Sequence, residues 1–263
     1  MKSMKWINTI AFGAMVIVNA LADLIPIGGN TTGEVSAAYP TLFTPAPVTF
    51  AIWGLIYLMM LFFVIYQWRG KGENGSVVQE IGPWFAVSCI MNIAWIFSWH
   101  LGAIELSVIY IIGLLVSLAA VERSLGFVTQ GGLTRRAAVD LGFELYFGWI
   151  IAATIVNVSA ALVKLQWDGF GRSDEFWTVV MLLVGAIIAC IVVITEGRWM
   201  SALAVIWAYT GILIRHFSAG GFAGRYPVVI AAAFIGIVAM TACVFVEILS
   251  HTKHSYEPLA GRG

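Results

Sequence analysis

Two aromatic side chains with polar tips lie one helical turn apart inside an apolar stretch of the sequence. Trp53 and Tyr57 follow the proline-containing segment "TPAP" at residues 44–47, and Trp95 and Trp149 are likewise set inside apolar runs. A buried indole N–H or phenol hydroxyl needs a hydrogen-bond partner, and several converging rings form a pocket with flat faces and few donors. Such a pocket suits a flat, mostly apolar ligand, although spacing alone favours core packing.

Amides and acids also lie deep in the apolar runs. Asn19, Asn92 and Asn157 fall near the middle of their runs, where an amide most often bonds across helices and less often contacts a ligand. Glu144 and Glu247 are the deeper acids, and no Lys or Arg lies at the same depth. We therefore expect these two carboxyl groups to be protonated or to face a wet cavity, which leaves proton-linked transport open as an alternative function.

Several kinds of chemistry are not indicated. The sequence has no G-x-S-x-G, H-E-x-x-H, P-loop or strand-associated G-x-G-x-x-G pattern, and its three cysteines are spread through apolar runs. We predict no catalytic residue, no metal site and no required cofactor. The formal net charge is zero, which argues against a nucleic-acid partner.

The composition predicts an all-α polytopic membrane protein. Of the 263 residues, 60% are hydrophobic and only 11% are charged, whereas soluble domains are about 25% charged. A spanning helix needs about 20 mostly apolar residues. Eight runs qualify, which gives a bundle of about eight transmembrane helices: residues 6–27, 46–67, 82–101, 104–121, 140–163, 175–195, 199–215 and 227–249.

The basic residues predict the orientation. If the N-terminus is cytoplasmic, ten of the 14 Lys and Arg residues fall in cytoplasmic segments, and the first loop (residues 28–45) is outside and has none. We therefore expect a multi-pass protein of the cell (plasma) membrane with both termini cytoplasmic. Residues 251–263 form a short polar tail.

Four stretches in order resemble the TspO/MBR family, the translocator or peripheral benzodiazepine receptor proteins, also called tryptophan-rich sensory proteins. They are "YPTLFTPAPVTFAIWGLIYLMM", "MNIAWIFSW", "IELSVIYIIGLLVSLAAV" and "LYFGWIIAATIVN". The likeness covers roughly residues 1–165, and the three helices expected in residues 166–250 have no counterpart in the short members. The residues in register with the family patterns are Pro45, Val48, Trp53, Tyr57, Met59, Asn92, Ala94, Trp95, Tyr146, Trp149, Ala153, Thr154 and Asn157.

The resemblance implies that the first five helices form the family's five-helix bundle, with a pocket that opens toward the first loop. The family binds porphyrins, haem-type tetrapyrroles, sterols and aromatic drug-like molecules, and bacterial members are linked to light-dependent porphyrin breakdown. Its partners would be membrane lipid and a small hydrophobic ligand, and a homodimer stays open. The ligand-binding residues implied here are Trp53, Tyr57, Asn92, Trp95, Tyr146, Trp149, Ala153 and Asn157.

We therefore predict an integral membrane sensor or binding protein for a flat hydrophobic ligand, a porphyrin or related tetrapyrrole. The alternative is a proton-linked transporter of a small molecule. The prolines before Trp53 are expected to position the first loop as a lid, because proline fixes φ and is not tolerated deeper in a helix.

Overall fold

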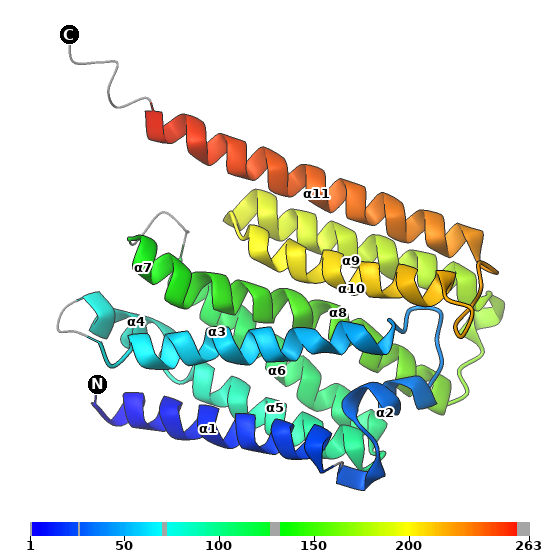
Figure 1. Cartoon of the computed structure of the whole chain (residues 1–263), viewed down its shortest axis with the longest axis horizontal. Coiled ribbons are helices and arrows are strands. Elements are labelled where there is room, and N and C mark those ends of the chain that lie inside the picture. Colours follow the sequence, from blue (N-terminus) through cyan, green and yellow to red (C-terminus); the bar gives the residue numbers. More distant parts are fainter. Residues whose placement is uncertain (1, 26, 70–72, 127–131, 257–263) are drawn as a thin grey trace.

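The computed structural model of the chain describes residues 2–25, 27–69, 73–126 and 132–256 (Figure 1). Within these ranges the protein is all-α with no β-strand, as predicted. Successive long helices run in alternating directions, so that α1 begins and α11 ends at the same end of the bundle. The eight long helices are α1 (Lys2–Leu24), α3 (Ile52–Tyr66), α5 (Trp84–His100), α6 (Ile104–Leu125), α8 (Leu141–Lys164), α9 (Asp174–Glu196), α10 (Trp199–Phe217) and α11 (Pro227–Tyr256).

Each predicted span is occupied by one of these helices. Seven helical segments of the described chain are long and apolar enough to cross a membrane. The remaining one, α5, has 17 residues, which is near the lower limit for a span, and it packs between α1 and α6. Helix α11 continues to Tyr256, so the predicted tail begins inside it, and residues 257–263 lie outside the described residues.

Short helical elements connect the long ones. The first loop contains α2 (Thr32–Ala38), and a 3-10 turn, η2 (Pro47–Ala51), leads into α3. Helix α4 (Glu73–Ile81) precedes α5, while α7 (Leu133–Arg135) and a π-helical turn, η3 (Arg136–Asp140), precede α8. The first loop is therefore a folded structure at one end of the bundle, and α4 and α7 lie at the other end (Figure 1).

Helix α8 joins the first five long helices to the last three. It packs against α3 and α6 on one side and against α10 on another. The approach to α10 is close, because a Cβ atom on Gly148 would lie 2.1 Å from the backbone carbonyl oxygen of Ser201. The Ser201 hydroxyl donates a hydrogen bond of 2.9 Å to the carbonyl oxygen of Glu144. Only a glycine permits this contact between the two helices.

Helix α10 also holds the segment that leads into α3. The Ala46 N–H donates to the carbonyl oxygen of Gly211 at 3.0 Å, and the indole N–H of Trp207 donates to the carbonyl oxygen of Thr49 at 2.8 Å. Pro47 lies in the first turn of η2, where its missing N–H costs nothing. The start of α3 is thus fixed by a helix more than 150 residues later in the chain.

Two buried ion pairs lie at the bundle end opposite α2. Arg198 pairs with Glu122, and both side chains are almost fully buried. Glu144 is also buried, and its carboxylate accepts hydrogen bonds from Arg136 and, at 3.2 Å, from the N–H of Met200. The expectation that Glu144 lacks a basic partner is therefore wrong. Arg136 precedes the predicted span, which begins at residue 140, but η3 continues α8 backwards and brings the guanidinium to the carboxylate.

The α8–α10 contact predicts the effect of one methyl group. Gly148→Ala should destabilise the protein by about 1–3 kcal/mol, because its Cβ meets rigid backbone. Gly54→Ala is the matched control, because no atom lies within 4 Å of its Cβ position on α3. It should be neutral or stabilise by up to ~1 kcal/mol through helix propensity. Thermal unfolding in detergent measures both, and equal midpoints would contradict the packing.

Candidate functional site

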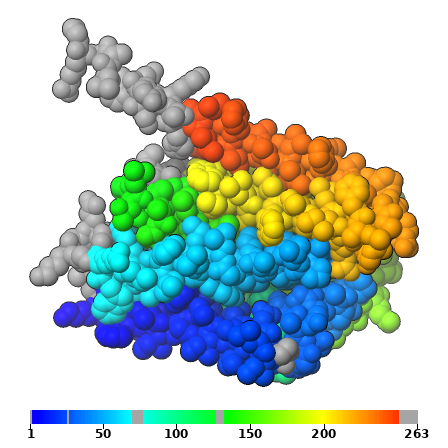
Figure 2. Space-filling view, viewed as in Figure 1, coloured from blue at the N-terminus to red at the C-terminus, as the bar shows by residue number. Residues whose placement is uncertain are grey.

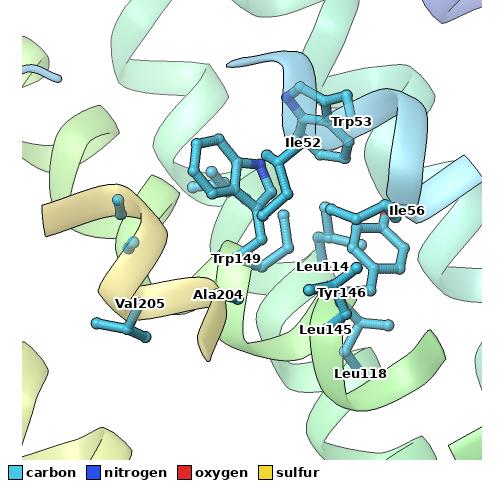
Figure 3. Close-up of a cluster of buried hydrophobic side chains, with 14 of the residues drawn as sticks. Ile52, Trp53, Ile56, Leu114, Leu118, Leu145, Tyr146, Trp149, Ala204 and Val205 are labelled. Carbon is cyan, nitrogen blue, oxygen red and sulfur yellow. The ribbon is translucent and has the colours of Figure 1, made fainter. Parts of the chain in front are cut away.

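Trp53 of α3 lies at the centre of the predicted aromatic residues. Its ring centroid is 5.6 Å from that of Tyr57, 5.7 Å from Trp95, 5.8 Å from Tyr146 and 6.1 Å from Trp149. The Tyr57 ring is nearly parallel to the indole, at 23°, and the Trp149 ring is edge-on, at 84°. Figure 3 shows Trp53, Tyr146 and Trp149 pointing toward one another from α3 and α8. Rings from three helices thus converge within the bundle.

Two amides hold α1, α5 and α8 together beside these rings. The Asn92 amide donates to the Tyr146 hydroxyl at 3.0 Å, and the Asn19 amide donates to the Asn92 side-chain oxygen at 2.6 Å. Asn92 and Tyr146 have no exposed surface. The prediction that these amides bond across helices is confirmed, and it explains how polar groups are tolerated at this depth.

A second set of bonds fixes the Trp95 indole. Its N–H donates to the side-chain oxygen of Asn157 on α8 at 2.7 Å, and the Asn157 amide donates to the Ser107 hydroxyl on α6 at 2.8 Å. The Asn157 side chain therefore accepts one hydrogen bond and donates another, and it links α8 to α5 and α6. Trp95 has its indole N–H satisfied, which leaves only its ring faces for other contacts.

The rings enclose a small cavity, which we call the aromatic chamber. Its volume is about 20 Å³, enough for roughly one water molecule. Five of the eight predicted residues line it. Of the other three, Tyr57 and Tyr146 pack against Trp53, and Asn92 bonds to Tyr146. Among the described residues, the buried indole N–H of Trp149 and the hydroxyl of Tyr57 have no hydrogen-bond partner. The lining residues are Phe50, Trp53, Trp95, Trp99, Trp149, Ala153, Val156 and Asn157.

Sequence reasoning missed Phe50, Trp99 and Val156. Trp99 carried a usable signal, because it follows Trp95 by four residues and so shares its helix face. The two indoles are stacked, with centroids 6.1 Å apart. Phe50 gave no such signal, since it belongs to η2 and reaches Trp149 edge-on at 6.0 Å only through the tertiary fold.

The chamber is covered at one end by residues 27–38, which we call the lid. Helix α2 packs against α5, η2 and α8. A Cβ atom on Gly33 would lie 3.6 Å from the ring of Phe50, so the lid rests on a residue that lines the chamber. In Figure 2 the medium-blue part of the chain that follows the dark blue N-terminal helix covers the lower right end of the bundle.

Polar contacts of Thr32 dock the lid onto α1 and α5. Its backbone N–H donates to the Asp23 carboxylate at 3.1 Å, and its hydroxyl lies 3.1 Å from Nε2 of His100. Its carbonyl oxygen accepts from the indole N–H of Trp99 at 3.2 Å. The other ring nitrogen of His100, Nδ1, donates to the carbonyl oxygen of Ile27 at 3.1 Å. These contacts anchor both ends of residues 27–32.

The lid helix also has its own capping box. The Thr31 hydroxyl accepts from the Glu34 N–H, and the Glu34 carboxylate accepts from the Thr31 backbone N–H at 2.7 Å. This backbone hydrogen bond, followed by one from the Thr31 hydroxyl, holds the pKa of Glu34 below its usual value. The stabilisation is present at neutral pH and is lost as the pH falls through that lowered pKa.

Comparison with known proteins identifies the family. A family model described as "TSPO-like protein" matches residues 5–246. The chain belongs to the TSPO-like protein family. The match extends past residues 1–165, on which the resemblance rested, and takes in α9, α10 and most of α11. Neither the curated proteins nor the solved structures contain a match to this TSPO-like chain. With its apolar helices, the chain is a multi-pass membrane protein.

The lid contacts predict the effect of removing one hydroxyl. Thr32→Val keeps the shape of the side chain and the backbone hydrogen bond to Asp23. It leaves Nε2 of the buried His100 without its hydroxyl partner, which costs about 1–3 kcal/mol. Amide hydrogen exchange in residues 31–38 should therefore become faster. Thr195→Val is the control, because that exposed hydroxyl bonds only to the Ile191 carbonyl of its own helix. Unchanged exchange in the Thr32 variant would show that these bonds do not hold the lid.

Proposed function

We propose that this TSPO-like protein is a membrane sensor or binding protein for a flat hydrophobic ligand, a porphyrin or related tetrapyrrole, held between helices under the lid. One observation carries the proposal: rings of α3, α5 and α8 share one chamber with a buried indole N–H, that of Trp149, that lacks a partner among the described residues. The Trp149 side chain is only 2% exposed, so water does not satisfy this donor from the surface.

The chemistry of the chamber supports a flat aromatic ligand. Indole rings in stacked and edge-on arrangements offer π faces, and such pairs contribute about 0.5–1.5 kcal/mol each beyond their buried area. An unsatisfied buried donor costs about 1–3 kcal/mol, which a ligand acceptor would recover. The tetrapyrrole nitrogens and carboxylates are acceptors of this kind. Ring stacking would therefore give affinity, and the Trp149 donor would give orientation.

The size of the chamber supports a two-state mechanism. A space of about 20 Å³ has no room for a tetrapyrrole, so we infer that the chamber must widen before it binds one. We infer that the ligand binds to a state in which the lid has moved away from Phe50 and the rings have separated. The ligand then favours the open state by its differential affinity, and lid position is the output of the sensor.

A porphyrin titration tests the site. Trp53→Phe/Trp149→Phe should raise the Kd for protoporphyrin by about tenfold or more, because it removes two indole faces and one donor. Binding is followed by the shift of the porphyrin absorbance band in detergent. The control is Trp6→Phe/Trp84→Phe, whose indoles are 58% and 39% exposed. Equal affinity in the two double variants would reject the aromatic chamber as the binding site.

A space-filling substitution provides a second test. Ala153 lines the chamber, and Ala153→Leu adds more volume than the closed chamber holds. We expect porphyrin binding to be lost at a stability cost of about 1–3 kcal/mol. Ala242→Leu, on the exposed face of α11, should change neither quantity. A folded Ala153 variant that binds porphyrin as the unaltered protein does would contradict the proposal.

Proton-linked transport has less support from the structure. That alternative relied on buried acids without partners, and the Glu144 carboxylate is held by Arg136 and the Met200 N–H. Uptake into proteoliposomes driven by a pH gradient would support the transport function.

Light-dependent porphyrin breakdown would need the same chamber and would appear as bilin-like products under illumination. We also propose, from the basic residues, that both termini are cytoplasmic.

A further inference from the structure

A second and larger cavity lies on the opposite face of α8. Its volume is about 290 Å³, and we call it the α8–α9 groove. Ala153, Val156 and Asn157 of α8 face the aromatic chamber, whereas Ile155 and Val158 line the groove. Helix α8 therefore separates the two spaces, and an occupant of one does not enter the other. The groove is also bordered by residues 40–43, which follow the lid helix.

The shape of the groove fits a single hydrocarbon chain. Its wall on α8 extends from Thr154 to Val163, which at 1.5 Å per residue is a length of about 14 Å. Dividing the volume of about 290 Å³ by this length gives a mean cross-section of roughly 21 Å². That area is close to the cross-section of one extended alkyl chain and much smaller than the face of a planar tetrapyrrole. The inner wall is mostly apolar, with Val158, Leu162 and Met181 among its members, and its polar side chains are the small hydroxyl residues Thr154, Ser159 and Thr178.

The mouth of the groove has a different chemistry. Trp167 and Trp177 line it with ring centroids 5.1 Å apart. The Trp177 indole N–H donates to the carbonyl oxygen of Gly169 at 2.8 Å, which fixes the orientation of the ring. Asp174 also lines the groove, and its carboxylate pairs with no basic residue that the structure describes. Two indoles and a free carboxylate form the combination that attracts an alkylated ammonium group.

We propose that the α8–α9 groove binds one hydrocarbon chain of a zwitterionic membrane lipid, with the ammonium of its head group against the Trp167–Trp177 pair and beside the Asp174 carboxylate. The surrounding bilayer supplies such lipids at high local concentration, and the mouth lies at the lid end of the bundle, where α8 ends and α9 begins. An anionic head group would meet the Asp174 carboxylate instead. Arg172 does not line the groove, because its guanidinium lies over the Phe176 ring, 5.7 Å from the centroid.

Photolabelling in nanodiscs tests this proposal on the full chain. Phosphatidylcholine with a mid-chain diazirine should label peptides that contain residues 154–163 and 174–181. The same reagent with a phosphatidylglycerol head should label them at least about threefold less, because it lacks the ammonium. Asp174→Asn should bring the phosphatidylcholine labelling down toward the phosphatidylglycerol level. This surface substitution leaves the packing of the bundle intact.

A groove-filling variant and a matched control complete the experiment. Ser159→Phe places a ring in the groove and should remove most of the labelling, whereas Ile187→Phe, on the exposed face of α9, should retain it. Equal labelling by the two lipid heads in the unaltered protein would overturn the ammonium site. Labelling that survives Ser159→Phe would overturn the chain site. Neither labelling outcome changes the result expected from the porphyrin titration, because that experiment tests the chamber on the other face of α8.

Discussion

The constraint on which this structure depends is that a bilayer provides no hydrogen-bond partners for buried polar groups. The Trp95 indole N–H, the Asn157 amide and the Ser107 hydroxyl satisfy one another across α5, α6 and α8. Asn92 and Tyr146 do the same between α5 and α8. Each bond fixes the depth and rotation of the helices that it joins. The convergence of the aromatic rings follows from these bonds, because rings on helices of fixed register have fixed neighbours.

The C-terminal helices contribute to this arrangement. Helix α10 contacts α8 through Gly148 and contacts the segment before α3 through Gly211 and Thr49. That segment carries Phe50, which lines the aromatic chamber and supports the lid. A change in the position of α10 would therefore be transmitted to both the chamber and its cover.

The two faces of α8 border two different spaces. One face closes a small chamber of indoles, in which a ligand must displace packed rings, and the other borders an open groove within the membrane. Residues 27–38 cover the first space, and residues 40–43 border the second. The same first loop thus contacts both, so the groove lies next to the segment that covers the chamber.

The sequence by itself determined the eight helices, the inward placement of Trp53, Trp95 and Trp149, and the cross-helix role of the amides. It could do so because hydrophobic run length and polar residues at mid-span depth are local properties. Only the tertiary structure decided that Arg136 reaches Glu144, that Phe50 joins the chamber, and that the chamber is closed. These depend on which helices pack together and at what distance. Periodicity identifies the face of a helix that is buried, but it contains no information about the partner that buries it or the volume left between them.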